Sequence, residues 1–123
     1  MMDRTEFEIL VRDALDDLPE EFARRLENVE VVIEDEPSPQ LLRSLGMNPQ
    51  RDTLFGLYQG VPLHRRGNSY GGALPDKISI FYRPLLHACV TPDRLRTQVR
   101  RTVIHEIGHF FGLDDDEIRA LGY

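Results

Sequence analysis

This chain of 123 residues has one cysteine, no long apolar run and no excess of positive charge. Cys89 is the only cysteine, so no disulfide can form within the chain, as is usual in a reducing compartment. Nowhere do about eighteen apolar residues run together, and we therefore expect no membrane span. The first residues are charged and lack the apolar segment of a secretory signal peptide. These absences predict a cytoplasmic protein.

The overall charge is acidic, with a net charge of −6. This argues against a nucleic-acid partner, because phosphate binding requires a basic face. The composition is 41% hydrophobic and 29% charged, which is ordinary for a globular protein. A chain of this length builds one hydrophobic core, so we expect residues 1–123 to form a single domain. Nothing in the sequence indicates an oligomeric state.

Apolar spacing and residue type predict the first elements. Helices are expected over residues 3–17 and from Pro19 onward, where the proline suits a first helical position. Strand-forming residues predict strands over residues 29–33, 54–59 and 78–82.

Between these strands the residue types predict helix caps and turns. Ser38 and Pro39 predict the start of a short helix, and Gly46 predicts its end. Four glycines in residues 60–72 predict a long, turn-rich loop.

The longest predicted helix begins at Thr91 and Pro92 and ends at Gly112, with a short final helix over residues 115–121. Its apolar residues share one face: Leu95, Val99, Val103, Ile107, Phe110 and Phe111. His105 and His109 lie on a different face and point toward something other than the core.

Residues 105–115 have the pattern H-E-x-x-H-x-x-G-x-x-D. Histidines at positions i and i+4 lie on one face of a helix, where one Zn²⁺ can bind both at about 2.0–2.1 Å. Glu106, beside the metal, can take a proton from a zinc-bound water. The sequence therefore predicts one zinc ion on His105 and His109, with Glu106 as general base.

Asp115 is the expected third ligand. Gly112 can adopt a left-handed conformation that turns the chain back toward the metal. Only eight residues follow Asp115, so a glutamate on a later helix, as in thermolysin, is not expected. Glu117 is the only later glutamate and lies too near in sequence to sit on a separate helix. Other candidates stay open at this point: Asp114, Asp116, His64 and His87.

The motif resembles that of the zincin metallopeptidases, and its spacing resembles that of the metzincins, with Asp115 where most metzincins have a third histidine. The chain is more closely similar to a minimal zincin-like family of small, bacterial, cytoplasmic proteins with the pattern H-E-x-x-H-x-x-G-x-x-D/S. This resemblance implies an α+β fold, in which a small mixed β-sheet packs on the helix that carries the motif. Metzincins also place a methionine beneath the metal after the motif. The methionines here are all upstream, and we interpret Met47 as ordinary packing.

The resemblance and the residues together predict a zinc-dependent metallopeptidase that acts on a peptide or protein. A donor to the reacting carbonyl oxygen could come from Tyr70, Tyr82 or His87. Zincin substrates pair with an edge strand above the metal, and residues 78–82 are the strand expected to serve.

Two other functions remain open. The first is a zinc-binding module with little or no peptidase activity, in which the metal only holds the fold. The second is a metal-dependent endoribonuclease, but that family has glycine where this chain has Glu106 and carries a third metal histidine. We interpret the basic residues of the long helix as a solvated face rather than an RNA groove; they are Arg94, Arg96, Arg100 and Arg101.

Overall fold

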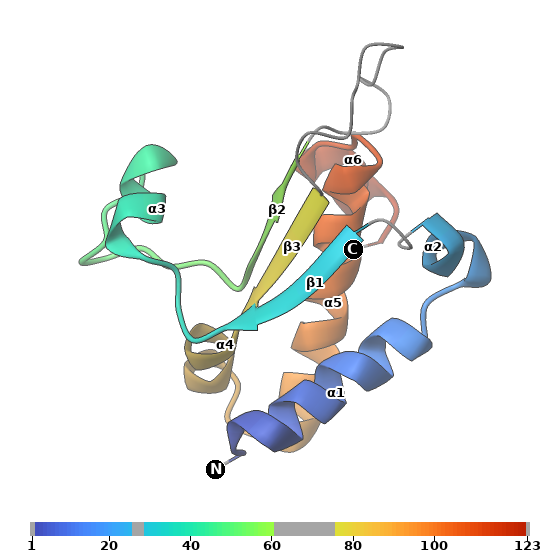
Figure 1. The fold of residues 1–123 in the computed structure, drawn as a ribbon, viewed down its shortest axis with the longest axis horizontal. Coiled ribbons are helices and arrows are strands. Elements are labelled where there is room, and N and C mark those ends of the chain that lie inside the picture. The colour runs from blue at the N-terminus through green and yellow to red at the C-terminus, as the bar shows by residue number, and fades with distance from the viewer. Residues whose placement is uncertain (1, 26–28, 61–75, 123) are drawn as a thin grey trace.

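The structure is a computed structural model that describes residues 2–25, 29–60 and 76–122. It has an α+β fold, as expected, with a three-stranded sheet and helices (Figure 1). The elements, in chain order, are α1 (Arg4–Asp16), α2 (Glu20–Arg25), β1 (Val29–Glu34), α3 (Pro39–Ser44), β2 (Gly56–Gln59), β3 (Asp76–Phe81), α4 (Tyr82–Ala88), α5 (Pro92–Phe110) and α6 (Asp115–Ala120).

The sheet is mixed, with strand order β1-β3-β2. β1 runs parallel to β3, and β2 runs antiparallel to it on the other side. The expectation that residues 78–82 form an edge strand is therefore wrong, because β3 has a neighbour on each side. Its residues 78–81 are all buried, which is typical of a central strand covered on both faces. Among the described strands, the edge of the sheet near α5 belongs to β2.

The core lies between the sheet, α5 and α1, and α5 runs behind the sheet in Figure 1. The predicted apolar face of α5 is buried except for Phe111, which follows the last helical residue and is partly exposed. Most of the buried side chains that meet there come from three elements: Phe7, Leu10, Val11 and Ala14 from α1, Ile78 and Ile80 from β3, and Leu95, Val99, Val103, Ile104 and Ile107 from α5. This packing fixes the orientation of the helix that carries the motif.

Helix α4 was not predicted from the sequence. It begins at Tyr82, directly after β3, and Pro84 lies in its first turn. A proline is tolerated there because the first N–H groups of a helix have no partner within it. Pro84 therefore belongs to the start of a helix.

The predicted ends of α5 are confirmed. The Thr91 hydroxyl accepts a hydrogen bond from the Arg94 N–H at 3.2 Å, and Pro92 is the first helical residue. At the other end Gly112 has φ 89°. The Gly112 N–H donates to the His109 carbonyl at 2.9 Å, and the Leu113 N–H donates to the Gly108 carbonyl at 3.0 Å. This pair of bonds is a Schellman turn, which sends the chain back along α5 into α6.

Candidate metal centre

Three side chains from α5 and α6 converge at the C-terminal end of α5. His105 and His109 lie one turn apart, with ring centroids separated by 4.8 Å. The Asp115 Oδ1 atom lies 3.0 Å from the His105 Nε2 atom and 3.1 Å from the His109 Nε2 atom. Potential ligand atoms of all three residues lie within 4.8 Å of one another. Imidazole nitrogen and carboxylate oxygen are donors that zinc binds in proteins, so these residues fit a zinc ion.

A contact between α5 and α6 places Asp115 there. Gly108 packs against the buried Ile118, and a Cβ atom at Gly108 would lie 2.7 Å from the Ile118 Cγ1 atom. A Cβ atom at position 108 would overlap the Ile118 side chain, so glycine there lets α6 pack closely on α5. The sequence analysis did not identify Gly108, although it lies within the motif, because its role depends on a residue ten positions later.

The His109 ring is oriented by a backbone group. Its Nδ1 atom lies 2.9 Å from the Leu113 carbonyl oxygen. A carbonyl can only accept a hydrogen bond, so Nδ1 carries a proton, and Nε2 is the ring atom that faces Asp115 and can bind a metal. The Schellman turn therefore has two effects: it returns the chain toward α5, and it brings this carbonyl to His109.

The neighbouring acids have other partners. The Asp114 side chain accepts from the Glu117 N–H at 2.8 Å, and the Glu117 side chain accepts from the Asp114 N–H at 3.1 Å. This reciprocal pair is a capping box at the start of α6. The Asp116 side chain is 92% exposed and lies 3.6 Å from the Arg119 guanidinium. Of these four acids, Asp115 is the one that meets the histidines.

Glu106 is buried between α5 and β2, with 7% of its surface exposed. Its Oε1 atom accepts a hydrogen bond from the Tyr58 backbone N–H at 3.0 Å. Burial raises the pKa of the Glu106 carboxyl, while the nearby His109 and His105 oppose that rise. A carboxyl with a raised pKa is suited to exchanging protons near neutral pH.

Gly56 permits this approach of β2 to α5. A Cβ atom at Gly56 would lie 2.7 Å from the Thr102 Cγ2 atom and 3.2 Å from the Glu106 Cγ atom. Neither Gly56 nor the Tyr58 N–H was identified from the sequence, because the Tyr58 and Glu106 residues are 48 positions apart.

The outer edge of β2 faces the same region. The Phe81 N–H donates to the Phe55 carbonyl at 2.9 Å, and Gly56 lies opposite Ile80. Hydrogen-bonded and non-bonded pairs alternate in an antiparallel ladder, so Gly56 and Tyr58 direct their backbone groups away from β3. Within the described residues no other strand pairs with this edge.

A cavity of about 460 Å³ adjoins the centre. Residues 53–56 form one wall. The other wall comes from α5 and includes Arg101, Thr102, His105 and Glu106. The proposed base and one histidine are therefore accessible from this cavity.

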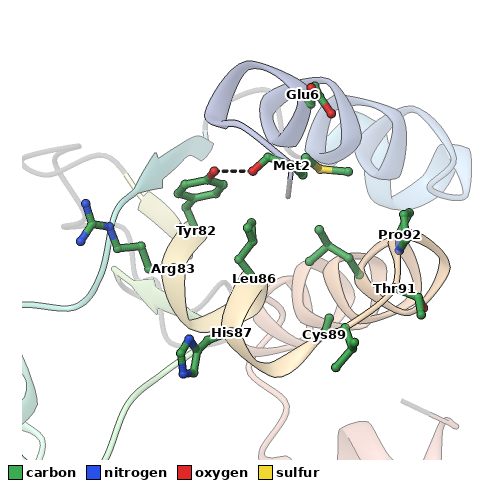
Figure 2. A pocket seen from close by; sticks show the side chains of 11 residues that line it. Met2, Glu6, Tyr82, Arg83, Leu86, His87, Cys89, Thr91 and Pro92 are labelled. Carbon is green, nitrogen blue, oxygen red and sulfur yellow. Dashed lines mark hydrogen bonds between the residues drawn. The ribbon is translucent and has the colours of Figure 1, made fainter.

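A larger cavity, of about 800 Å³, lies elsewhere, between the start of α1 and the segment from α4 to α5 (Figure 2). Tyr82 and His87, considered above as donors to the reacting oxygen, line this larger cavity instead. The Tyr82 hydroxyl donates to the Met2 carbonyl at 2.6 Å. Their assignment as donors is therefore withdrawn. Tyr70 and the alternative ligand His64 lie outside the described residues.

Comparison with known proteins agrees with this architecture. A family model described as zincin-like metallopeptidase matches residues 26–123. The chain belongs to this zincin-like family. The fold is also similar to the solved structure of a conserved hypothetical protein from Thermus thermophilus, with a TM-score of 0.59 and 25% sequence identity. That match covers 89% of this chain and 94% of the other.

A search of curated proteins found no match. In the described part of this zincin-like chain, no helix has the length and apolar character needed to cross a membrane.

Proposed function

We propose that the chain is a zinc-dependent metallopeptidase in which His105, His109 and Asp115 hold one zinc ion. The observation that carries this proposal is the position of the Asp115 Oδ1 atom, within 3.1 Å of both histidine Nε2 atoms. Three protein ligands leave a fourth coordination position for water, which is the arrangement of catalytic zinc sites. A zinc ion that only holds a fold has four protein ligands, and in the described residues three groups converge here.

Zinc, when bound, lowers the pKa of a coordinated water and polarises a carbonyl oxygen. With zinc bound, Glu106 would accept a proton from the attacking water and would give it to the nitrogen of the leaving amine. The Tyr58 N–H holds Oε1 in place, so we assign the proton transfer to Oε2. Burial limits the rotation of this carboxylate and raises its pKa, which strengthens it as a proton acceptor.

The peptide is expected to bind as an extended strand along β2. Gly56 directs its backbone groups outward on this edge, and main-chain hydrogen bonds to an extended peptide are sequence-tolerant. In this role β2 replaces residues 78–82, because residues 78–81 belong to the central strand β3 and Tyr82 begins α4. The proposed substrate is an extended or unfolded segment of a peptide or protein.

The test is a comparison of zinc-loaded wild-type protein with Glu106→Gln. Hydrolysis of a pool of unstructured peptides is followed by mass spectrometry, and zinc content is measured on the same samples. Loss of the base is expected to lower the hydrolysis rate by roughly 10²- to 10⁴-fold, while zinc remains bound because its three ligands are unchanged. Glu117→Gln is the control, since Glu117 belongs to the capping box of α6. Hydrolysis at the wild-type rate by zinc-loaded Glu106→Gln would show that the role of Glu106 is wrong.

A further inference from the structure

We propose, resting on the peptidase function above, that Arg101 binds a carboxylate of the substrate one or two residues from the cleaved bond. The substrate class is thus a peptide with an acidic side chain, or a free C-terminal carboxylate, at that position. Both sources present the same group to the guanidinium.

The first support is the position of Arg101. It precedes His105 by four residues on α5, so the two side chains lie on one face of the helix. Both line the cavity of about 460 Å³ that also reaches Glu106. A ligand in this cavity therefore contacts the guanidinium and the proposed catalytic residues together.

The second support is the charge of the cavity. Among its lining residues, Arg101 carries a permanent charge and the buried Glu106 carries one when ionised, and residues 53–56 are uncharged. Glu106 is bonded to the Tyr58 N–H rather than to Arg101. Within the described residues no carboxylate lies within ion-pair distance of the exposed Arg101 side chain. With no such partner in the described part of the chain, the guanidinium can accept a ligand, and it favours a planar carboxylate that can accept two hydrogen bonds.

The spacing sets the position of the carboxylate. One helical turn advances about 5.4 Å, whereas an extended peptide advances about 3.3 Å per residue. The turn between Arg101 and His105 therefore corresponds to one or two substrate residues.

The two ends of the site also differ in charge. The first turn of α6, beyond His109, carries Asp116 and Glu117. A peptide with its carboxylate toward Arg101 keeps that charge away from these acids, whereas the reverse placement brings like charges together.

The test uses peptides that carry a zinc-binding hydroxamate. One series carries it at the N-terminal end and the other at the C-terminal end, so that the peptide can extend from the metal in either chain direction. In each probe the first or the second residue counted from the hydroxamate is either Glu or Gln. A C-terminal end without the hydroxamate is amidated, so that it carries no carboxylate. A further Gln probe ends in a free C-terminal carboxylate. Dissociation constants for the zinc-loaded protein are measured by calorimetry, so the readout does not depend on hydrolysis.

We expect at least one carboxylate probe to bind the wild-type protein roughly 10- to 100-fold more tightly than its amidated Gln counterpart. Arg101→Ala is expected to remove this preference, and Arg101→Lys to retain part of it. Arg100→Ala is the matched control, because it removes the same charge from a neighbouring residue that does not line the cavity. It is expected to keep the preference.

The outcomes separate this inference from the function on which it rests. A preference for Glu probes assigns the carboxylate to a side chain, and a preference for the free C-terminus assigns it to the chain end; either supports the role of Arg101. Equal binding of carboxylate and amide probes, or a preference that survives Arg101→Ala, overturns the role of Arg101 and leaves the metal centre intact. Binding of none of the probes overturns the metal centre and this inference with it.

Discussion

Helix α5 contributes to two cavities, one at its beginning and one along its second half. The first, of about 800 Å³, is lined by apolar side chains such as Leu86 and the exposed Val90, together with His87 and Cys89 (Figure 2). The second, of about 460 Å³, adjoins the converging groups of the metal centre. The convergence of ligand atoms and buried charge, rather than cavity volume, therefore indicates where chemistry can occur.

The difference arises from what packs on each part of α5. Near its start, the segment before α5 leaves Val90 exposed. Its second half lies between β2 and α6, and glycines at positions 56 and 108 let both elements approach closely. Close approach buries Glu106 and brings Asp115 to the histidines. The following predictions test whether this distinction between the two cavities holds.

The largest effect is expected from removal of a proposed ligand. Replacing His109 by alanine should lower zinc affinity by more than about 100-fold, because loss of partners that only orient a ligand already costs about 10- to 100-fold. Zinc affinity is measured by competition with a chelator. His87→Ala, in the larger cavity, should leave it unchanged.

The same measurement tests the third ligand. Asp115→Ala should also lose zinc, whereas Asp116→Ala, at an adjacent exposed acid, should retain it. Zinc retention by Asp115→Ala would move the third ligand to another residue, and zinc loss in His87→Ala would make the larger cavity part of the metal site.

A smaller effect is expected where α6 packs on α5. Alanine is about 1 kcal/mol more favourable than glycine inside a helix, yet Gly108→Ala should destabilise the protein by about 1–3 kcal/mol because its Cβ would overlap Ile118. Urea unfolding measures the change. In an Ile118→Ala background the overlapping Cγ1 and Cδ1 atoms are absent, so Gly108→Ala should become stabilising. A stabilising Gly108→Ala in the wild-type background would show that close packing does not place Asp115.

The parts of this arrangement that the sequence predicted are those set by local spacing. The positions of His105 and His109 follow from helical periodicity, and the turn at Gly112 follows from the capping preferences of glycine. Asp115 was the favoured third ligand for the same reason, since it comes three residues after that turn. The structure brings these groups together, and their role as ligands stays a prediction.

The parts that were missed depend on contacts between distant residues. The strand composition of residues 78–81 predicted β3 but not that it is central, because strand order is set by packing rather than by the strand itself. The Tyr58 N–H reaches Glu106 only after β2 has docked on α5. The larger cavity was missed for the same reason, since Met2 and Tyr82 are 80 positions apart.

The smallest effect concerns the thiol of the larger cavity. Burial raises the pKa of Cys89, and the positive charge of Arg94 opposes that rise. Alkylation follows the thiolate fraction, which is lower at a given pH when the pKa is raised. Cys89 should therefore react with iodoacetamide at pH 8 more slowly than the cysteine of an unstructured peptide.

Arg94→Ala should slow the reaction further, by roughly twofold to threefold, whereas Arg101→Ala should not. Mass spectrometry of timed samples gives the rates. Alkylation faster than that of the free peptide would mean that the larger cavity holds an activated nucleophile, and the contrast between the two cavities would then fail at the Cys89 thiol.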